Sequence, residues 1–291
     1  MNNPLVSVCI PTYNGEKYIQ EALDSIKKQT YRNIEVIISD DSSTDKTREI
    51  CEVFKDEVNF PVYIFSHQPA GIGSNWNNSI AKANGEYIKF LFQDDLLASN
   101  CIEVMLYYLL SHDLDIILCK RIIISEDFGL EETENWLTKF GDLQKGINLE
   151  FDDFYLFGKK DLYRLGSKYQ LSYNFLGEPV TSLFSKKLYN TIGEYSTELK
   201  QMLDIEYYLR ILIHTDIGLI NKKLISFRIH NNQTSTINEN SRIDESKFID
   251  QLLVQQFNRN LNKKQKNKIL YNRYPFLDKF VRLMYRYKIF N

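Results

Sequence analysis

The fold is decided by VSVCIPTYNGE at residues 6–16 and by IEVIISDDSSTD at residues 34–45. Each stretch begins with a short apolar run, as a buried strand does, and ends in polar and small residues. Between them, residues 18–29 carry apolar side chains at the spacing of one helix face: Ile19, Ala22, Leu23 and Ile26. A strand, a helix and a second strand in this order predict two parallel strands joined by a covering helix.

The same alternation continues to about residue 120. We expect a helix after the cap cluster Ser42-Ser43-Thr44, another over residues 74–83, and strands over residues 62–65, 86–92 and 114–119. Alternating strands and helices predict an α/β fold with a mostly parallel sheet flanked by helices. Because such sheets bind ligands outside the carboxyl ends of their strands, we expect the site at that edge.

The composition is that of a globular protein. Of the 291 residues, 43% are hydrophobic and 25% are charged, which is enough for a large core. We expect no signal peptide and no membrane span, since no apolar run reaches the roughly 20 residues that cross a bilayer. The four cysteines stand singly in apolar segments, which favours buried reduced thiols over disulfides or zinc, and thereby the cytosol.

The C-terminal segment differs in charge from the rest of the chain. From residue 240 onward, twelve Lys and Arg oppose four Asp and Glu, an excess of +8, whereas the net charge of the whole chain is −2. Apolar residues from Phe276 to Phe290 are interleaved with these basic residues, and we expect helices here. Such a helix can lie on an anionic membrane surface. The alternative is that the helices pack on the rest of the chain or form a homodimer contact, with their charges solvated.

Gln93-Asp94-Asp95 follows the strand expected over residues 86–92. Adjacent carboxylates repel each other, and a hard divalent cation relieves that repulsion. Mg²⁺ and Mn²⁺ bind carboxylates together with the oxygens of a substrate diphosphate, so this pair suits a nucleotide leaving group. The alternative is a helix N-cap, a position where Asp is also favoured.

Two further polar segments follow the first two strands. The segment from Asp40 to Asp45 places carboxylates where one of them can accept the N3–H of uracil or thymine, although a plain capping box gives the same pattern. In the segment from Pro11 to Glu16, Tyr13 can stack on a base or serve ordinary packing. The three segments should converge on one rim of the sheet.

The order and spacing of these motifs resemble family 2 glycosyltransferases, which are inverting enzymes of the GT-A fold. The resemblance extends over roughly residues 5–235 and continues through Gly71 to Asn77, Ala83 to Ile88, Asp94-Asp95 as the DXD-type motif, Gly177 to Pro179, Ile192 to Tyr195, Leu203 to Arg210 and Phe227 to His230. It implies a GT-A type sheet with a C-terminal helical extension. We expect a GT-A domain over residues 1–238, with a nucleotide-sugar-binding half at 1–120 and an acceptor-facing half at 121–238, and a basic helical tail at 239–291.

Carried over residue by residue, the resemblance implies roles for individual side chains. Asp204 matches the general base and Asp95 the metal ligand, while His230 completes the metal shell or contacts the diphosphate. Contacts with the nucleotide sugar are implied at Pro11, Thr12, Tyr13, Glu16, Asp41, Asn77, Gln93, Asp94 and Arg228. Gln93 departs from the family pattern, because many members carry Asp there.

A base at Asp204 also makes chemical sense, since the acceptor hydroxyl must lose a proton as it attacks the anomeric carbon. The alternative for Asp204 is an N-cap or a surface charge of a helix expected over residues 205–213. For His230, a structural role is the alternative.

The resemblance implies an inverting hexosyl- or N-acetylhexosaminyltransferase that uses a UDP- or dTDP-sugar with Mg²⁺ or Mn²⁺. Its implied acceptor is a growing, polyprenyl-linked glycan in capsule, O-antigen or related polysaccharide synthesis. The implied location is the cytoplasm, peripheral on the inner face of the cytoplasmic membrane.

Other classes fit less well. A non-catalytic nucleotide-sugar-binding or scaffold protein of the same fold would not need both Asp95 and Asp204. A sugar nucleotidyltransferase needs a glycine-rich loop after the first strand, where this chain has Pro11 to Gly15 with one glycine, and Gly71-Ile72-Gly73 lacks the spacing of a Rossmann dehydrogenase. Outside the basic tail the chain is acidic and shows no nucleic-acid-binding module, so we expect no nucleic acid as a partner.

Overall fold

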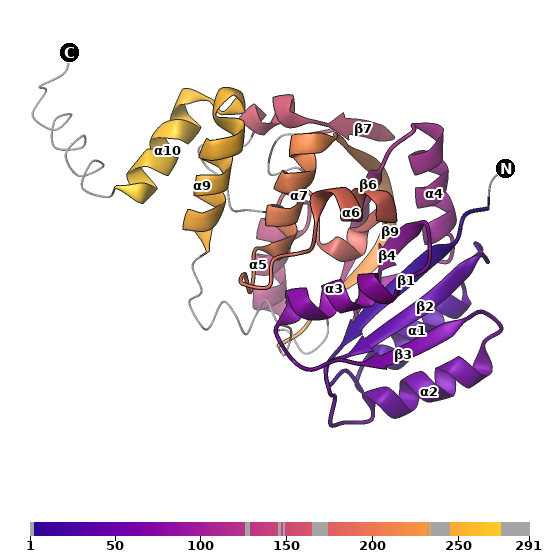
Figure 1. Cartoon of the computed structure of the whole chain (residues 1–291). Helices are drawn as coiled ribbons and strands as arrows, with labels where there is room; N and C mark the ends of the chain where they lie inside the picture. The colour runs from indigo at the N-terminus through magenta and orange to yellow at the C-terminus, as the bar shows by residue number, and fades with distance from the viewer. Residues whose placement is uncertain are drawn as a thin grey trace, which may run out of the picture.

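The computed structural model describes residues 3–125, 129–144, 147, 149–164, 174–231, 233 and 245–274. Within these residues one mixed sheet forms the centre of the molecule, with the strand order β3-β2-β1-β4-β8-β6-β9-β5 and with β7 paired to β9 (Figure 1). The strands are β1 (Val6–Thr12), β2 (Ile34–Asp40), β3 (Val62–Ser66), β4 (Tyr87–Phe90), β5 (Leu96–Leu97), β6 (Ile116–Ser125), β7 (Phe154–Phe157), β8 (Ser182–Ser185) and β9 (Ile217–Ile229).

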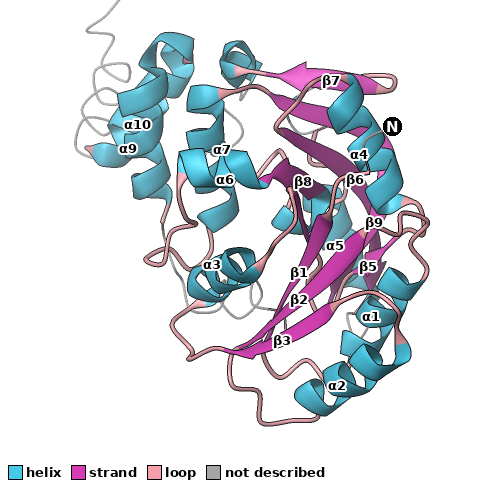
Figure 2. Ribbon diagram, turned by 45° about the vertical axis from the view of Figure 1, so that its right-hand side comes forward, coloured by secondary structure: helices cyan, strands magenta, loops and turns pink. Residues whose placement is uncertain are grey.

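The helices connect these strands and flank the sheet. They are α1 (Ile19–Lys27), α2 (Thr47–Glu57), α3 (Ile72–Lys82), α4 (Cys101–Ser111), α5 (Leu130–Phe140), α6 (Lys186–Ile192), α7 (Leu203–His214), α9 (Ser246–Phe257) and α10 (Lys263–Arg273). Short 3-10 helices stand at Lys159–Arg164, Pro179–Thr181 and Asn258–Asn260. Figure 2 shows α1, α2 and α4 on one side of the sheet and α3, α6 and α7 on the other.

The first half of the chain has the predicted parallel arrangement. β1 pairs in parallel with β2 and β4, and β2 pairs in parallel with β3. Both faces of β1 and β2 are covered by helices, which explains their nearly continuous apolar sequences. The four side chains that predicted the face of α1 are all fully buried. The α/β class, the flanking helices and the mostly parallel sheet of this half are therefore confirmed.

The second half makes the sheet mixed. β8 lies antiparallel between β4 and β6, while β6 and β9 run parallel to each other. The strand predicted over residues 114–119 starts two residues later and continues to Ser125, past Lys120 and Arg121. Lys120 and Arg121 concealed this continuation. Glu178, which pairs with Arg121, and β9, against which the register of β6 shifts, both lie far from β6 in sequence.

The C-terminal helices pack on the sheet domain. Ile249, Leu253 and Phe257 of α9 are buried in the same hydrophobic cluster as α7, and Gln265 of α10 donates a hydrogen bond to the carbonyl of Leu162. In Figure 1 α9 lies beside α7 and α10 lies beside α9, at the opposite side of the molecule from α2. The amphipathic segment predicted from Phe276 to Phe290 lies outside the described residues.

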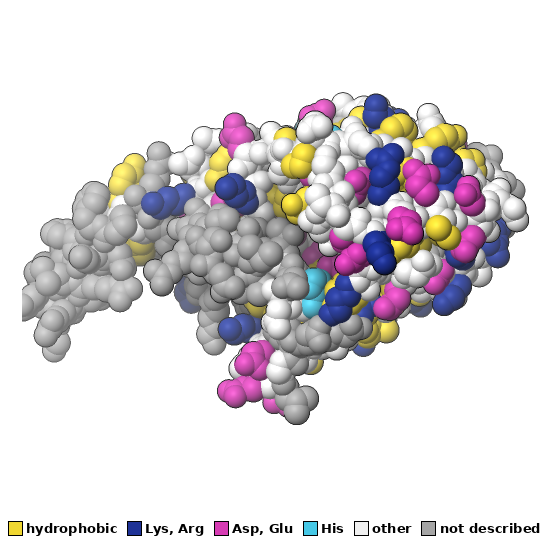
Figure 3. Space-filling model, turned by 90° about the horizontal axis from the view of Figure 1, so that it is seen from below, with side chains coloured by type: hydrophobic (Ala, Val, Ile, Leu, Met, Phe, Trp, Pro, Cys, Tyr) yellow, Lys and Arg dark blue, Asp and Glu magenta, His cyan; other side chains and the backbone are white. Residues whose placement is uncertain are grey.

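Two expectations from composition can be compared with the structure. All four cysteines are buried and free, as predicted. None of the helices in the described part of the chain has the length and apolarity to cross a membrane. On the face that Figure 3 shows, acidic and basic side chains are interspersed over its right-hand part, as on an ordinary solvated surface.

Candidate functional site

The carboxyl ends of β1, β2, β3 and β4 meet at one edge of the sheet, because these strands are parallel. Thr12 pairs with Asp40 at the ends of β1 and β2, and the backbone N–H of Asp41 donates to the carbonyl of Thr12. The predicted convergence of the polar segments is thus present in the backbone, and His67, which follows β3, joins the same edge.

A network of short polar side chains fixes the loops at this edge. The hydroxyls of Thr12 and Ser43 both donate to the Asp40 carboxylate, at 3.0 and 2.5 Å. Glu16 accepts a hydrogen bond from the backbone N–H of Lys46 at 3.0 Å. Asp45 accepts from the backbone N–H and the hydroxyl of Thr47, so Asp45 serves the start of α2. The N-cap of α2 is Lys46, and no side chain forms a cap hydrogen bond there, so the capping box that was the alternative for this segment is not formed.

Asp41, His67 and Ser74 form a chain of side-chain hydrogen bonds. Its carboxylate is hydrogen-bonded to Nδ1 of His67, whose Nε2 lies 3.3 Å from the hydroxyl of Ser74 on α3. Burial raises the pKa of Asp41, and the hydrogen bond from His67 opposes that rise. The His67 ring fixes the orientation of one carboxylate oxygen and leaves the other for a ligand.

Tyr13 is the most exposed aromatic residue of the edge, with 56% of its surface accessible. Its backbone is held by Gln93: the Tyr13 N–H donates to Oε1 at 2.9 Å, and Nε2 donates to the Tyr13 carbonyl at 3.1 Å. The Gln93 amide therefore joins the ends of β1 and β4, a function that an Asp at this position would perform with one hydrogen bond less. Pro11, two residues before Tyr13 in β1, is half-buried.

Asp94 faces His230. The Asp94 Oδ2 and His230 Nε2 atoms are 3.1 Å apart, and the exposed fractions of the two side chains are 23% and 11%. Arg228, two residues earlier on β9, donates from Nε to the Asp94 carbonyl and from Nη2 to Glu21 of α1. The Arg228 side chain, for which a donor contact was predicted, thus holds the Asp94 backbone. Its guanidinium also lies 4.5 Å from the centre of the Tyr18 ring.

Asp95 is buried, with 1% of its surface accessible. Its Oδ1 accepts from the backbone N–H of Arg228 at 2.9 Å, whereas its Oδ2 has no hydrogen-bond partner among the described residues. Burial, and next the charge of Asp94, raise the pKa of Asp95 well above its ordinary value. Asp95 therefore fastens the metal-motif turn to β9 from inside the protein.

Asp204 lies in the first turn of α7, whose N-cap is Met202. Its Oδ1 accepts from the backbone N–H of Ile205 at 2.7 Å and its Oδ2 from the Asn174 amide at 2.5 Å. Burial raises the pKa of Asp204 to about 7, and the charge of Glu178 adds to the rise. A carboxylate with this pKa is matched to accepting a proton near neutral pH.

Asn77 lies away from the open edge. Its amide nitrogen donates to the Tyr195 carbonyl, and its oxygen accepts from the Tyr195 N–H and the Tyr189 hydroxyl. This buried amide joins α3 to the second half of the chain. A contact of Asn77 with the donor stays a prediction.

Glu178 connects the two halves of the site. It accepts two hydrogen bonds from the Arg121 guanidinium, at 2.6 and 2.9 Å. The charge of Glu178 raises the pKa of both Asp95 and Asp204, so both carboxyl groups lie within its electrostatic reach. Glu178 therefore lies near both the Asp94-Asp95 motif and Asp204.

Sequence analysis gave no site role to His67, Asn174 or Arg121. His67 had a usable signal, because it is a polar residue directly after a parallel strand. Asn174 and Arg121 had none, since their partners Asp204 and Glu178 are 30 and 57 residues away in sequence.

The Asp94 and His230 pair can hold a divalent cation. Its carboxylate oxygen and imidazole nitrogen are ligands that Mn²⁺ and Mg²⁺ accept, and such ions take their remaining ligands from water and substrate phosphates. Among the residues that the structure describes, no three His, Cys, Asp or Glu side chains gather at one point. The protein thus offers a two-residue site of the kind that a nucleotide diphosphate completes.

Residues 7–167 match the sequence model of the family described as Glycosyl transferase family 2. The chain is 31% identical over 236 residues to an uncharacterized glycosyltransferase of Rickettsia typhi, which covers 80% of this chain and 66% of that protein. It is 40% identical over 121 residues to the abequosyltransferase RfbV of Salmonella typhimurium, covering 40% of this chain and 36% of that protein. The chain therefore spans only part of the length of these relatives.

Solved structures share the fold. The chain resembles TarS of S. aureus in complex with UDP-GlcNAc, with a TM-score of 0.63 and 22% identity over 92% of this chain and 70% of that one. It also resembles the mannosyltransferase PcManGT of Pyrobaculum calidifontis in complex with GDP-Man and Mn²⁺, with a TM-score of 0.55 and 18% identity over 77% and 56% of the two chains. At these identities the likeness supports the fold alone.

Proposed function

Because the chain belongs to glycosyltransferase family 2, we propose that it is an enzyme that transfers a sugar from a nucleotide-sugar donor to a hydroxyl group of a saccharide acceptor. The observation that carries this proposal is the match of residues 7–167 to the family, and the buried, hydrogen-bonded Asp204 supports it. A donor diphosphate at the motif and an acceptor hydroxyl at Asp204 would then meet across one site.

The donor base binds at the ends of β1 and β2. The Asp41 carboxylate, oriented by His67, accepts the N3–H of a pyrimidine ring, and the exposed Tyr13 ring packs on the base. A guanine ring also carries N–H groups, but uracil and thymine fit a single carboxylate acceptor. We therefore propose a UDP- or dTDP-sugar as donor.

The cation site consists of Asp94 and His230. Sequence reasoning assigned the metal to Asp95 with His230, but the carboxylate that faces His230 is that of Asp94, and Asp95 is buried behind it. A bound Mg²⁺ or Mn²⁺ neutralises charge on the diphosphate as it leaves. Asp95 and Arg228 hold the Asp94 backbone in place for this contact.

Asp204 acts as the general base. Its Oδ2 is held by Asn174, and with a pKa of about 7 it accepts the proton that the acceptor hydroxyl loses. One carboxylate suffices for a single displacement at the anomeric carbon, which inverts its configuration. NMR of the product should therefore show a β-linkage from an α-linked donor, and a retained configuration would contradict this mechanism.

The acceptor is a growing lipid-linked glycan in surface polysaccharide synthesis. The abequosyltransferase relative supports the transfer of a sugar residue, and the basic C-terminal segment supports a peripheral place at an anionic cytoplasmic membrane surface. Since α9 and α10 pack on the domain, membrane contact falls to residues 275–291. Vesicle co-sedimentation tests this: binding to anionic vesicles should be lost when residues 275–291 are deleted, and unchanged binding would favour a packing or dimer role.

A donor-hydrolysis screen tests the proposed activity. The full chain is incubated with UDP-, dTDP- and GDP-sugars and with Mg²⁺, Mn²⁺ or EDTA, and released nucleotide is measured. We expect turnover of a UDP- or dTDP-sugar that EDTA abolishes and that Asp204→Asn lowers. Donor binding without any turnover, unaltered in Asp204→Asn, would favour the non-catalytic binding or scaffold protein.

A further inference from the structure

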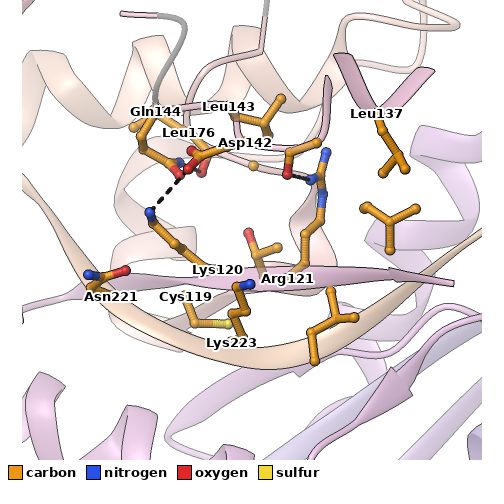
Figure 4. Close-up of a pocket in the computed structure, with 15 residues that line it drawn as sticks. Cys119, Lys120, Arg121, Leu137, Asp142, Leu143, Gln144, Leu176, Asn221 and Lys223 are labelled. Carbon is orange, nitrogen blue, oxygen red and sulfur yellow. Dashed lines mark hydrogen bonds and ion pairs between the residues drawn. The ribbon is translucent and has the colours of Figure 1, made fainter. Parts of the chain in front are cut away.

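A cavity of about 270 Å³ lies over β6 and β9 and has no part in the function proposed so far. We call it the β6–β9 cavity. Its walls are β6 from Cys119 to Ile123, β9 at Asn221 and Lys223, the segment that includes Leu137 and residues 141–144, and residues 176, 177 and 181. In Figure 4, Lys120 and Arg121 extend from the strand toward the segment that carries Asp142 and Gln144.

The cavity coincides with an irregularity of the sheet. Lys120 pairs with Lys223 and Arg121 with Ile225, and the register of β6 against β9 shifts on both sides of Lys120. Extra residues in one strand bend it and redirect its side chains, and such bulges are frequent next to active sites. Here the bulges bring three basic side chains onto the walls of one cavity.

These three basic side chains differ in the hydrogen bonds and ion pairs that they form with the protein. Arg121 is buried and is taken up by Glu178 and the Phe140 carbonyl. The Lys120 ammonium lies 3.5 Å from an Asp142 carboxylate that is 44% exposed, a weak ion pair that an incoming anion can replace. Lys223 is exposed at the mouth. Lys120 and Lys223 are therefore the cations that a ligand meets.

One wall of the cavity is tied to the general base. Leu176 and Gly177 line the cavity, and their backbone N–H groups donate to Oδ1 of Asn174 at 3.1 and 3.0 Å. The amide nitrogen of the same Asn174 donates to Asp204. This wall is therefore connected to Asp204 through the Asn174 amide.

The cavity also lies apart from the donor site. In the sheet, β4 and β8 separate β1, which leads to Tyr13, from β6. A molecule that reaches Asp204 across β6 and β9 thus approaches from a different side than the nucleotide. Its rim carries the exposed apolar side chains of Ile122 and Leu137, which suit the apolar face of a sugar ring.

We propose that the β6–β9 cavity is an acceptor subsite that binds an anionic group of the saccharide acceptor, a phosphate ester or a uronate carboxylate, through Lys120 and Lys223. The proposal rests on the proposed glycosyltransferase function. It narrows the acceptor class to acidic glycans or glycan phosphates.

Calorimetric titration of the full chain tests the subsite. The protein is first saturated with UDP and Mg²⁺, so that the donor site is closed to the probes, and is then titrated with glycerol 3-phosphate, glucuronate or uncharged methyl glucoside. We expect one of the two anions to bind at least about tenfold more tightly than methyl glucoside, which corresponds to about 1.4 kcal/mol. The tighter anion identifies the acceptor group as phosphate or carboxylate.

Matched lysine variants locate the binding. The double variant Lys120→Gln with Lys223→Gln should weaken anion binding about tenfold. Lys222→Gln is the control, because Lys222 is the neighbouring exposed lysine, is paired with Asp153 at 2.7 Å and lies outside the cavity. The control should bind the anion like the unchanged protein.

Equal anion affinity in the double variant and the control overturns the subsite, as does absence of binding by both anions. The separate UDP titration tests the proposed function. If UDP does not bind while anion binding still depends on the two lysines, the donor assignment fails and the anion site stands. If UDP binds and the anion affinity is the same with and without the two lysines, only the proposed acceptor subsite is wrong.

Discussion

Asp204→Asn should remove catalysis and at the same time stabilise the folded protein at alkaline pH. Burial raises the pKa of Asp204 from 3.8 to about 7, so the native fold disfavours its ionised form. At pH 8 the wild-type protein carries that unfavourable charge, whereas an amide is neutral. Loss of a general base lowers kcat by about 10²- to 10⁴-fold.

The magnitude follows from the two pKa values. The interval from 3.8 to about 7 corresponds to about 4 kcal/mol at 1.36 kcal/mol per pH unit. Between pH 3.8 and about 7, Asp204 has already lost its proton in the unfolded chain but keeps it in the folded chain. The free energy of unfolding of the wild type therefore falls as pH rises through this range. An amide keeps one acceptor oxygen and loses one of the hydrogen bonds from Asn174 and Ile205, which costs about 1 kcal/mol. The net gain is therefore about 3 kcal/mol at pH 8, with a loss of about 1 kcal/mol at pH 4.

Thermal unfolding between pH 4 and pH 8 measures this difference. At about 2–4 °C per kcal/mol, the Tm of the variant minus that of the wild type should change from slightly negative at pH 4 to clearly positive at pH 8. Asp56→Asn, at an exposed position of α2, is the control and should give a difference that does not depend on pH. A pH-independent difference for Asp204→Asn as well would refute the reasoning about its pKa.

Three further outcomes follow from the site. Asp94→Asn should reduce the gain in UDP affinity on adding Mn²⁺ by about tenfold in calorimetry, and an undiminished gain would move the cation elsewhere. His67→Asn keeps an N–H for Asp41 and should retain UDP affinity, whereas His67→Phe should lose about tenfold; equal losses would speak against an orienting role. Arg121→Leu leaves Glu178 without its counter-charge and should lower the free energy of unfolding in urea by about 3 kcal/mol, and a change within experimental error would contradict the importance of this ion pair.

The sequence predicted the first 120 residues of the fold well, and the reason is local. The strand over residues 6–10, the helix face of α1 and the strand over residues 34–39 each show their period within a dozen residues. Once the strands are parallel, the polar residues that end them must share an edge. Tyr13 and Asp41 could therefore be placed without a structure.

The structure after residue 120 depends on contacts between residues that are distant in sequence. β8 reads as a short apolar segment, and nothing in four residues says that it inserts antiparallel between β4 and β6. Adjacent carboxylates such as Asp94 and Asp95 look equivalent in sequence, and only the packing of β9 buries one and turns the other toward His230. The division of roles within a motif is set by tertiary structure.

The late insertion of β8 also has a consequence for the synthesis of the chain. β4 ends at Phe90, and its neighbour in the sheet begins at Ser182, so roughly 90 residues are made in between. At about 5–20 residues per second, a ribosome needs about 5–20 s for that stretch. Throughout this interval β8 is absent, and one edge of β4 has unpaired backbone N–H and C=O groups. Other nascent chains can form hydrogen bonds with these groups. Until this four-residue strand emerges from the ribosome, the unpaired edge of β4 exposes the newly made chain to aggregation.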